Sequence, residues 1–430
     1  MTSSMLLCST LPVSWKSVPL KSVATYEVSN VDKHAHDDEL AVRLCNYTDV
    51  YKNERITLDM ELMWATATEN EISKFHLEEE DVVITKDSEE WSDIAVPALI
   101  SETADDLVCG YHLAFIRSKP GVLSGRYLFR AIQSRPVALQ LELASTGVTR
   151  CGLPKGAIGA AKIPLPPLPN QLKIADFLDS ETARIDSLVE AKESMLDLIG
   201  QKRSALINNL VTRGLNPEAP IKSSGLDWLR DIPQHWEIER AKNLFSVRDE
   251  RSKEGDEELL SVSHITGVTS RASKEVNMFL AESMTGYKKC QKDDFVTNTL
   301  WAWMGAMGIS PLDGIVSPDY HVYESKGKIL PEFMELLCRS KPFVAEVTRW
   351  SKGVWSSRLR LYPENFFEIR FPVPPHEEQE AIVAEVAVFR DKTTKLTEAL
   401  IDSIRLLKER RSALITAAVN GEIPLEEMVA

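Results

Sequence analysis

The residues best equipped for chemistry lie together in one basic and aromatic window. From Arg339 to Arg360 the chain has six basic residues, and Glu346 is the only acid among them. Two tryptophans, several hydroxyls and Gly353 stand between these cations. Lysine and arginine neutralise phosphates, and arginine also donates two hydrogen bonds to the edge of guanine. The window therefore indicates contact with a nucleic acid, although a solvated run of charges would have the same composition.

A shorter segment, 298–303, places an amide and a hydroxyl beside two tryptophans. Amide and hydroxyl groups are common donors to phosphates and base edges. The tryptophans have a second interpretation, because they are often core residues. The candidate DNA-contacting residues in this half of the chain are Asn298, Thr299, Arg349, Lys352, Trp355, Ser356, Arg358 and Arg360.

The motifs that would make the chain an enzyme are missing from its sequence. There is no G-x-x-x-x-G-K-[ST] loop for ATP, no G-x-G-x-x-G after a predicted strand and no H-E-x-x-H. The segment 317–320 does not match the Asn/Asp-Pro-Pro-aromatic motif of amino-methyltransferases. The sequence His-Ala-His-Asp-Asp at 34–38 resembles a metal cluster only superficially, because it lies in an acidic, solvated stretch. We therefore predict no catalytic residue, no metal ion and no cofactor in this chain.

Length and composition are typical of a soluble protein with several domains. The chain has 430 residues, of which 43% are apolar and 27% are charged. No apolar run reaches the roughly 18 residues of a membrane helix, and the N-terminus does not resemble a signal peptide. The six cysteines are scattered without a C-x-x-C pair, so we expect reduced thiols in a cytosolic protein. The net charge of −14 argues against a nucleic-acid partner, but the basic window shows that the cations are concentrated.

The chain contains an internal duplication. The stretches 163–211 and 371–419 match without a gap at an offset of 208 residues, from a proline-rich segment through a glutamine to Arg-Ser-Ala-Leu-Ile and a valine. Looser matches at offsets between 208 and 221 pair 11–15 with 232–236, 81–85 with 294–298, 111–113 with 320–322 and Arg150 with Arg358. The order is therefore variable globule, repeated stretch, variable globule, repeated stretch.

Each repeated stretch is predicted to form one long helix. Its proline-rich lead-in cannot continue a helix, but beyond it apolar residues recur every three or four positions. Gly214 and Gly421 stand where the helices should stop. Roughly 40 helical residues would span about 60 Å, and the heptad-like stripes predict that the helices pair antiparallel. The predicted seam and subunit interface consists of Ile174, Leu178, Ile185, Leu188, Leu196, Ile199, Leu206, Ile382, Val386, Leu396, Ile404, Leu407 and Leu414.

The remaining segments are predicted to be mixed α/β globules. Residues 81–85 and 368–373 have the pattern of short strands, and 330–347 has the pattern of one helix. The predicted fold class is α+β, with two mixed α/β domains, two long helices and a pseudo-two-fold duplication. The predicted boundaries are 1–162 for the first globule, 163–215 for the first helix, 216–371 for the second globule and 372–430 for the second helix.

The repeated signature resembles the conserved regions of type I restriction–modification specificity subunits. It is a Pro-Leu-Pro-Pro lead-in, a glutamine and a long helix that ends in Arg-Ser-Ala-Leu-Ile-x-x-x-Val, carried by 163–211 and 371–419. Residues 225–236 resemble the beginning of that family's second target-recognition domain, and residues 353–375 resemble its end. The likeness covers essentially the whole chain.

The resemblance implies a DNA-reading subunit of a prokaryotic, cytoplasmic complex used in phage defence. Two target-recognition domains would each contact one half of a bipartite, asymmetric double-stranded DNA site. The helices would hold the halves apart and dock two methyltransferase subunits, which restriction (motor-nuclease) subunits join. Adenine methylation and cleavage, and the binding of S-adenosylmethionine, ATP and Mg²⁺, belong to those partners. The first globule lacks a window like 339–360, and its implied DNA contacts are Thr85, Lys86, Thr149 and Arg150.

Two other classes of function are weighed against this interpretation. A structural scaffold could use the same helices to join two protein partners without reading DNA, but it has no need for two divergent globules on matched helices. A nuclease would need clustered carboxylates and a lysine, and no such cluster is recognisable in the sequence.

Overall fold

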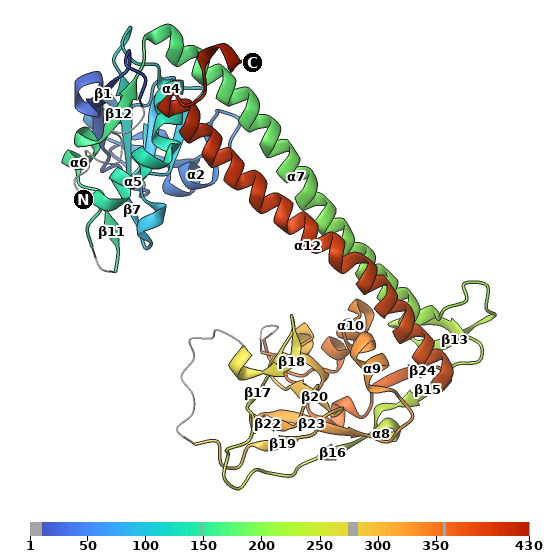
Figure 1. The fold of residues 1–430 in the computed structure, drawn as a ribbon. Helices are drawn as coiled ribbons and strands as arrows, with labels where there is room; N and C mark the ends of the chain where they lie inside the picture. Colours follow the sequence, from blue (N-terminus) through green and yellow to red (C-terminus); the bar gives the residue numbers. More distant parts are fainter. Residues whose placement is uncertain (1–10, 148, 274–282, 356–357, 430) are drawn as a thin grey trace. The chain divides into compact units, whose positions relative to one another are not determined.

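The computed structural model of the chain describes residues 11–147, 149–273, 283–355 and 358–429. The chain divides into two compact units, the first formed by residues 1–193 and 401–430 and the second by residues 194–400. Each unit contains one globular region and one end of each of two long helices (Figure 1). These helices are α7 (Leu168–Arg213) and α12 (His376–Asn420).

The globular region of unit 1 is built around a five-stranded sheet with the order β2-β10-β6-β8-β4. All neighbours are antiparallel except β4 and β8. The sheet strands are β2 (Ala24–Val28), β10 (Leu113–Ser118), β6 (Val82–Thr85), β8 (Pro97–Ile100) and β4 (Arg55–Ile56). A smaller sheet holds β5 (Met63–Ala67), β3 (Leu40–Cys45) and β9 (Leu107–Cys109), and two strand pairs join β1 (Lys16–Pro19) to β12 (Lys162–Leu165) and β7 (Asp87–Ser88) to β11 (Cys151–Gly152). The helices are α1 (Leu20–Val23), α2 (Tyr47–Lys52), α3 (Glu69–Phe75), α4 (Gly125–Gln133), α5 (Arg135–Ala144), α6 (Lys155–Ala160), and the 3-10 turns η1 (Trp91–Asp93) and η4 (Leu425–Glu427).

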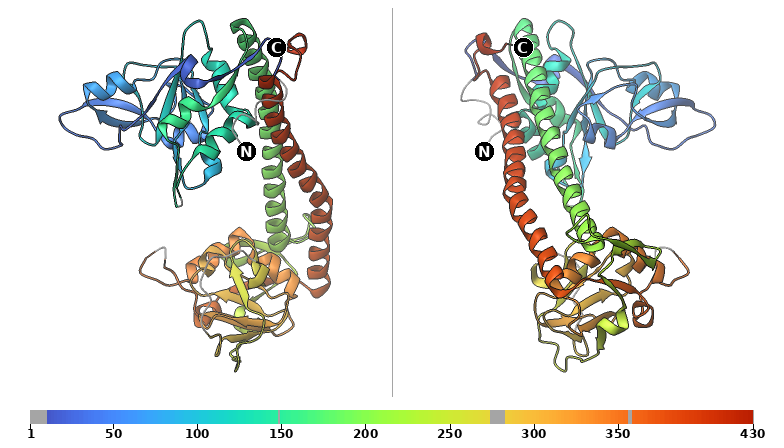
Figure 2. Two further views of the ribbon diagram at one scale, coloured as in Figure 1. Left: turned by 60° about the vertical axis from the view of Figure 1, so that its left-hand side comes forward. Right: turned by 90° about the vertical axis from the view of Figure 1, so that its right-hand side faces the viewer.

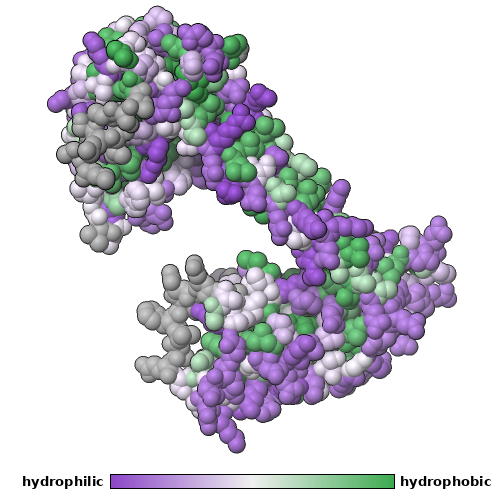
Figure 3. Space-filling model, viewed as in Figure 1, coloured by the Kyte–Doolittle hydropathy of each residue, from purple (hydrophilic) through white to green (hydrophobic). Residues whose placement is uncertain are grey.

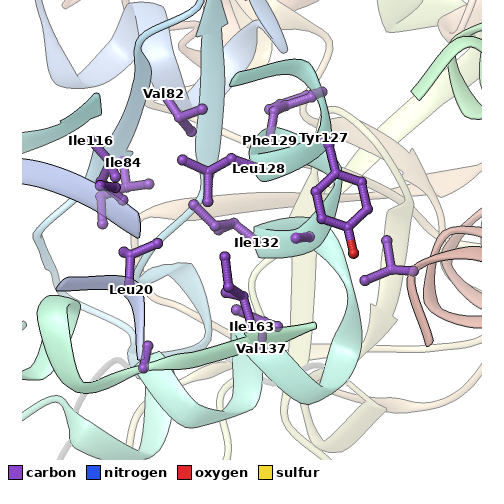
Figure 4. Close-up of a cluster of buried hydrophobic side chains, with 14 of the residues drawn as sticks. Leu20, Val82, Ile84, Ile116, Tyr127, Leu128, Phe129, Ile132, Val137 and Ile163 are labelled. Carbon is purple, nitrogen blue, oxygen red and sulfur yellow. The ribbon is translucent and has the colours of Figure 1, made fainter. Parts of the chain in front are cut away.

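The core of unit 1 lies between helix α4 and the large sheet (Figure 4). Val82 and Ile84 alternate along β6 and are fully buried, as the two-residue period of a strand requires. Leu128 and Ile132 lie one turn apart on α4 and are buried against them. Burial of such side chains contributes about 1.5–3 kcal/mol each before conformational entropy is counted.

The globular region of unit 2 repeats the same sheet with four strands in the order β16-β23-β20-β21, all antiparallel. These strands are β16 (Phe245–Arg248), β23 (Tyr320–Ser325), β20 (Phe295–Asn298) and β21 (Met307–Ile309). The strand pairs are β13 (Ile221–Leu226) with β14 (Leu229–Pro233), β15 (Glu237–Arg240) with β24 (Arg370–Val373), β17 (Leu260–Ser263) with β18 (Gly267–Ser270), and β19 (Lys288–Cys290) with β22 (Gly314–Val316). The helices are α8 (Ala241–Leu244), α9 (Pro331–Cys338), α10 (Lys341–Trp350), α11 (Pro363–Phe366), and the 3-10 turns η2 (Arg271–Ser273) and η3 (Ala302–Met304).

The duplication predicted from the sequence is confirmed by the order of the elements and by the repeated glutamine. Gln171 is fully buried in unit 1, where it accepts a hydrogen bond from the backbone of Ser124 and donates to the carbonyls of Val122 and Pro166. Gln379 makes the equivalent bonds in unit 2, with the backbone of Leu330, Lys328 and Pro374. Each glutamine therefore ties the start of a long helix to its own globule.

Each glycine that follows a long helix lies against one of the two repeated tryptophans. Gly214 follows α7 with a φ of 75°, and Gly421 follows α12 with a φ of 72°. A Cβ atom on Gly214 would lie 3.1 Å from the ring of Trp236, and one on Gly421 would lie 3.1 Å from the ring of Trp15. The predicted stops are confirmed, and both the left-handed backbone and the close ring require glycine.

The two long helices pair antiparallel within each unit, as predicted (Figure 2). In unit 1, Ile174 and Leu178 share a core with Ile415, while Asp186 and Glu193 pair with Arg411 and Lys408. In unit 2, Leu210 and Val211 share a core with Ile382 and Val386. A rising number on α7 therefore meets a falling number on α12.

Two predicted seam residues need correction. Leu188 is 47% exposed and Leu396 is 45% exposed, so neither is enclosed between the helices. Val189 and Leu400 are buried instead. A straight helix advances 3.6 residues per turn, so a stripe chosen by heptad spacing drifts off the contact line. Ile185 and Ile404 are buried as predicted, and the half-buried positions are Leu196, Ile199, Leu206, Leu407 and Leu414.

The strands predicted at 81–85 and 368–373 are confirmed as β6 and β24. The single helix predicted over 330–347 is wrong, because the chain turns at Arg339 and Ser340 between α9 and α10. Pro342 lies in the first turn of α10, where its missing N–H is tolerated, and it disfavours a helical conformation for the residue before it. None of the helices in the described ranges is long and apolar enough to cross a membrane.

Candidate DNA interface

The basic window of unit 2 ends in a hairpin whose described arms are residues 352–355 and 358–360. The backbone amide of Lys352 donates to the carbonyl of Arg360, and the amide of Arg360 donates back, each at 2.9 Å. A Cβ atom on Gly353 would lie 2.5 Å from the carbonyl oxygen of Arg358, so the two arms approach too closely for another residue. Trp355 is 70% exposed near the tip. The predicted loop is thus present, and it carries exposed cations at both arms.

The cations of the window differ in their partners. Arg349 forms an ion pair of 2.6 Å with Glu346, whose side chain is buried, and this hydrogen bond raises the pKa of the Arg349 guanidinium. Arg339 is similarly bound to Glu335 at 2.9 Å. Lys352, Arg358 and Arg360 are exposed and have no ion pair within the described part of the chain. These three residues therefore remain available to phosphates or bases, whereas Arg349 is partly neutralised.

Unit 1 has an equivalent hairpin, which the sequence analysis did not identify. Thr146 and Gly152 exchange backbone hydrogen bonds of 2.9 and 2.8 Å after helix α5, just as Lys352 and Arg360 do after α10. Gly147 has a φ of 130°, and a Cβ atom there would lie 1.9 Å from the carbonyl oxygen of Arg150. Arg150 thus occupies the position that Arg358 has in unit 2. The signal in the sequence was an arginine at the same distance before each repeated stretch, preceded within a few residues by a glycine.

Each hairpin is joined by an equivalent backbone hydrogen bond to the residue that follows a strand of the main sheet, β6 in unit 1 and β20 in unit 2. The amide of Leu153 donates to the carbonyl of Lys86 at 2.8 Å, and the amide of Leu361 donates to the carbonyl of Thr299 at 3.2 Å. The duplicated fold therefore places the hairpin, the residue after the central strand and the repeated Tyr-His dipeptide at one edge of each sheet.

In unit 1, Lys86, His112 and Arg150 lie together at this edge, and the carboxylate of Asp87 lies among them. Asp87 lies 2.8 Å from both Lys86 Nζ and His112 Nδ1, so that ring nitrogen donates the hydrogen bond. Burial by itself would raise the pKa of the Asp87 carboxyl, but the hydrogen bonds from Lys86 and His112 hold that pKa below its ordinary value. Arg150 Nη2 lies 3.1 Å from the other ring nitrogen of His112. His112 has a φ of 70°, a conformation that costs about 1–2 kcal/mol in a residue other than glycine.

The comparisons with known proteins agree with this duplicated architecture. A family model for the type I restriction modification DNA specificity domain matches residues 12–195. The chain is 23% identical to the type I restriction enzyme EcoBI specificity subunit of Escherichia coli, over 69% of this chain and 65% of that protein. It is 20% identical to the putative MjaX specificity subunit of Methanocaldococcus jannaschii, over 75% of this chain and 74% of that protein. The chain is therefore similar to type I restriction–modification specificity subunits, and residues 12–195 match the family's DNA specificity domain.

Other similarities agree with the fold and define the extent of the match. The MjaVIII specificity subunit of M. jannaschii is 23% identical over 31% of this chain, and the match spans only 29% of that protein. A chain solved in a study of complex assembly and conformational transition of the type I R-M system has a TM-score of 0.69 at 14% identity, covering 96% of this chain and all of that chain. The HsdS subunit of Thermoanaerobacter tengcongensis has a TM-score of 0.51 at 14% identity, over 97% and 99% of the two chains.

Three of the candidate DNA contacts are corrected by their burial. Thr85 is fully buried and donates to the carbonyl of Asp93 at 2.8 Å. Asn298 is 6% exposed and donates to Tyr320 at 3.1 Å, and Thr299 is 6% exposed and donates to the carbonyl of Asp319. Their polar groups are used within the fold, because residues at the end of a central strand must satisfy their donors internally. Their hydrogen bonds hold the surrounding loops, so we no longer count them among the candidate contacts.

The other candidates lie at the surface or outside the described ranges. Lys86 is half-buried beside Asp87, while Thr149 and Arg150 are exposed on the first hairpin. Ser356 lies outside the residues that the structure describes. The structure therefore brings Lys86 and Arg150 together at one site and presents Lys352, Trp355, Arg358 and Arg360 on a single hairpin in the other unit.

The chain also exposes apolar side chains along both long helices (Figure 3). Single exposed apolar residues are common, but several along one surface can mark the binding site of a partner. They are Leu172, Leu188, Met195 and Leu198 on α7 and Val388, Leu396, Ile401 and Leu406 on α12. No group of three or more His, Cys, Asp or Glu side chains placed to hold a metal ion occurs in the described ranges.

Proposed function

We propose that this chain is the DNA sequence-specificity subunit of a type I restriction–modification complex. It binds a bipartite, asymmetric target in double-stranded DNA, each globular region contacting one half. It directs adenine methylation by partner methyltransferase subunits and cleavage by partner restriction subunits. The observation that carries this proposal is the pair of equivalent hairpins, one in each unit, that present Arg150 and Arg358 at the same edge of the same sheet.

The cations of the second hairpin suit different parts of a DNA target. Lys352 is a flexible point charge suited to a phosphate. Arg358 and Arg360 have the planar guanidinium that can pair with two acceptors on guanine. In the first half, Arg150 and Lys86 supply the cations, and His112 adds a ring whose hydrogen bond to Asp87 fixes its orientation.

The chain itself is proposed to be non-catalytic. S-adenosylmethionine, ATP and Mg²⁺ are bound by the partner subunits, and the complex works in the prokaryotic cytoplasm. The recognition domains are assigned to residues 1–162 and 216–371, and the spacer helices to 163–215 and 372–430. The exposed apolar residues of α7 and α12 support docking of two methyltransferase subunits on these helices.

A scaffold that joins two proteins without reading DNA is the alternative. Exposed apolar helices would serve it equally well, but two hairpins carrying exposed arginines would not be needed. Methylome sequencing of the host with and without this gene separates the two functions. We expect a two-part motif to lose its methylated adenines on deletion. An unchanged set of methylated sites would favour the scaffold.

A further inference from the structure

A basic groove in unit 2 differs in charge from the equivalent pocket of unit 1, which is lined by Lys408 and Arg411 and whose two cations are paired with carboxylates. It lies between the long helices and the turn from α9 to α10, and its volume is about 640 Å³. Four cations line it, and Glu335 is the only carboxylate among the lining residues. We define the basic groove by Arg203, Ile207, Leu336, Lys341 and Arg390. In a chain with a net charge of −14, such a concentration of positive charge requires an explanation.

The one carboxylate in the groove is already occupied. Glu335 Oε1 lies 2.9 Å from Arg339 Nε, and its other oxygen accepts the backbone amide of Ile309 at 2.7 Å. Arg390 lies only within 4.0 Å of the exposed Asp391, a contact of little energy. Arg203 and Lys341 have no ion pair within the described part of the chain. Three cations of the groove are therefore not neutralised by the protein itself.

In unit 1 the arginine at the equivalent position is neutralised by carboxylates of the chain itself. Arg411 is the counterpart of Arg203 at the offset of 208 residues. Its guanidinium is bound by Asp186 at 2.9 Å and by Glu54 at 2.7 Å, and its side chain is only 17% exposed. At the position equivalent to Asp186, α12 has Thr394, so unit 2 lacks this acid.

A second acid of unit 1 is also replaced in unit 2. Asp179 on α7 is bound by Arg55, Arg126 and Arg130 at 2.7–2.9 Å and fixes α4 to the helix. Its counterpart on α12 is Ala387, and the counterpart of Thr182 is Arg390. The repeat has thus lost two carboxylates and gained a cation along the same helical face. The chain neutralises the arginine of this position with its own acids in unit 1, whereas no acid among the described residues does so in unit 2.

We propose that the basic groove binds an acidic, amphipathic segment of a methyltransferase partner, and this inference rests on the proposed function. The carboxylates of that segment take the place that Asp186 and Glu54 take in unit 1. The groove also offers apolar surface, since Ile207 and Leu336 are half-buried and the neighbouring Ile265 is 77% exposed. A DNA backbone would neutralise the cations but leave this apolar surface wet, so a protein segment suits the groove better.

The consequence is an asymmetry between two otherwise equivalent halves. One partner copy binds a half whose charges are satisfied within the chain, and the other gains additional ion pairs in the groove. Binding of that second copy should be the more sensitive to salt, because ion pairs at an accessible surface are screened.

The test uses the full-length chain and the purified methyltransferase subunit of the same system. The double variant Arg203→Glu, Arg390→Glu reverses two groove charges, and Lys202→Glu is the matched control on an exposed neighbouring position outside the groove. Native mass spectrometry gives the number of bound copies, and calorimetry gives their Kd at low and high salt. We expect the double variant to bind one copy as the wild type does and the other at least about tenfold more weakly. The control should bind both copies normally.

Each alternative result has a defined meaning. Two copies bound to the double variant with unchanged Kd would overturn the inference while leaving the proposed function intact. Unchanged partner binding together with a weaker, less salt-dependent affinity of the complex for DNA would place DNA in the groove and would also overturn it. If the wild type binds no methyltransferase at all, the proposed function fails together with the inference. Thermal unfolding of each variant confirms that the comparison is made between folded chains.

Discussion

At the scale of single residues, accessibility separates the cations that can bind DNA from those that hold the fold together. Arg349 and Arg339 lie in the same basic window as Lys352, but each has a carboxylate partner within 3 Å. Lys352 and Arg358 lie on a hairpin whose internal hydrogen bonds, among its described residues, are between backbone groups. The exposed hairpin residues are therefore the ones whose replacement should alter DNA binding.

We expect Lys352→Ala to weaken binding of the assembled complex to all DNA sequences alike. A lysine that neutralises one phosphate releases about one counterion, so the slope of log affinity against log salt should fall by about one unit. Fluorescence anisotropy at several salt concentrations measures it, with Lys222→Ala as an exposed control outside the hairpin. An unchanged slope would remove Lys352 from the interface.

Arg150→Ala and Arg358→Ala should act on different halves of the target. If each arginine pairs with a guanine, its loss costs about 1–3 kcal/mol and relaxes the preference at one position of one half only. A panel of half-site variants bound to the methyltransferase complex distinguishes the two. A uniform loss over both halves would instead assign these arginines to phosphates.

His321 should make the stability of the protein depend on pH. Burial and the neighbouring Lys288, whose Nζ is 3.4 Å from the ring, lower the pKa of His321 to about 4 from its ordinary 6.5. The unfolded chain then binds a proton between these values that the folded chain does not, so stability falls as the pH drops from 6.5 towards 4. The variant His321→Gln should lose stability less steeply in urea titrations over this range. Parallel curves for the two proteins would contradict the assignment.

At the scale of elements, each globule is fixed to its long helix by a buried glutamine. Gln171 and Gln379 satisfy two carbonyls and one amide each, at a point where the chain enters the helix. Because these partners are backbone groups in a buried region, they have no access to water if the glutamine is removed. The glutamine therefore connects the sequence repeat directly to the orientation of the recognition domain on its helix.

We expect Gln171→Leu to destabilise unit 1. Unsatisfied buried polar groups cost about 1–3 kcal/mol, so the midpoint of thermal unfolding should fall clearly. Gln201→Leu is the matched control, because Gln201 lies on the same helix, is exposed and contacts only Asp197. Equal melting curves for both variants would show that the glutamine has no structural role.

At the scale of the whole molecule, the duplication gives two units with one plan and different surfaces. The order of the main sheet is the same in both, while unit 1 adds β4 and the separate sheet of β5, β3 and β9. The hairpin of unit 2 has more cations than that of unit 1. Two related domains with divergent surfaces are what the recognition of two unlike half-sites requires.

The purified chain by itself should neither methylate nor cut DNA. The sequence has none of the nucleotide or methyl-donor motifs that were sought. Incubation with S-adenosylmethionine, ATP and Mg²⁺ should leave DNA unchanged, and methylation should appear when the methyltransferase partner is added. Methyl transfer by a preparation free of that partner would contradict the proposed function.

The sequence by itself determined the duplication, the two long helices and the position of the second hairpin. These features depend on local periodicity, on proline and glycine, and on a repeat at constant offset, all of which are properties of neighbouring residues in the chain. The register of the helix pair was only partly predictable, and Leu188 and Leu396 were misplaced because heptad spacing does not follow the actual contact line.

The tertiary structure decided which polar residues are accessible. Thr85 and Asn298 have the same chemistry as exposed DNA contacts, but strand pairing buries both, and burial depends on residues far away in the sequence. The first hairpin and the cluster of Lys86, His112 and Arg150 became visible only when three distant segments met at one edge of a sheet. The groove beside Arg203 could not be predicted from the sequence either. Arg203 and its counterpart Arg411 are the same residue type in the repeat, and they differ in the carboxylates that the fold places beside Arg411.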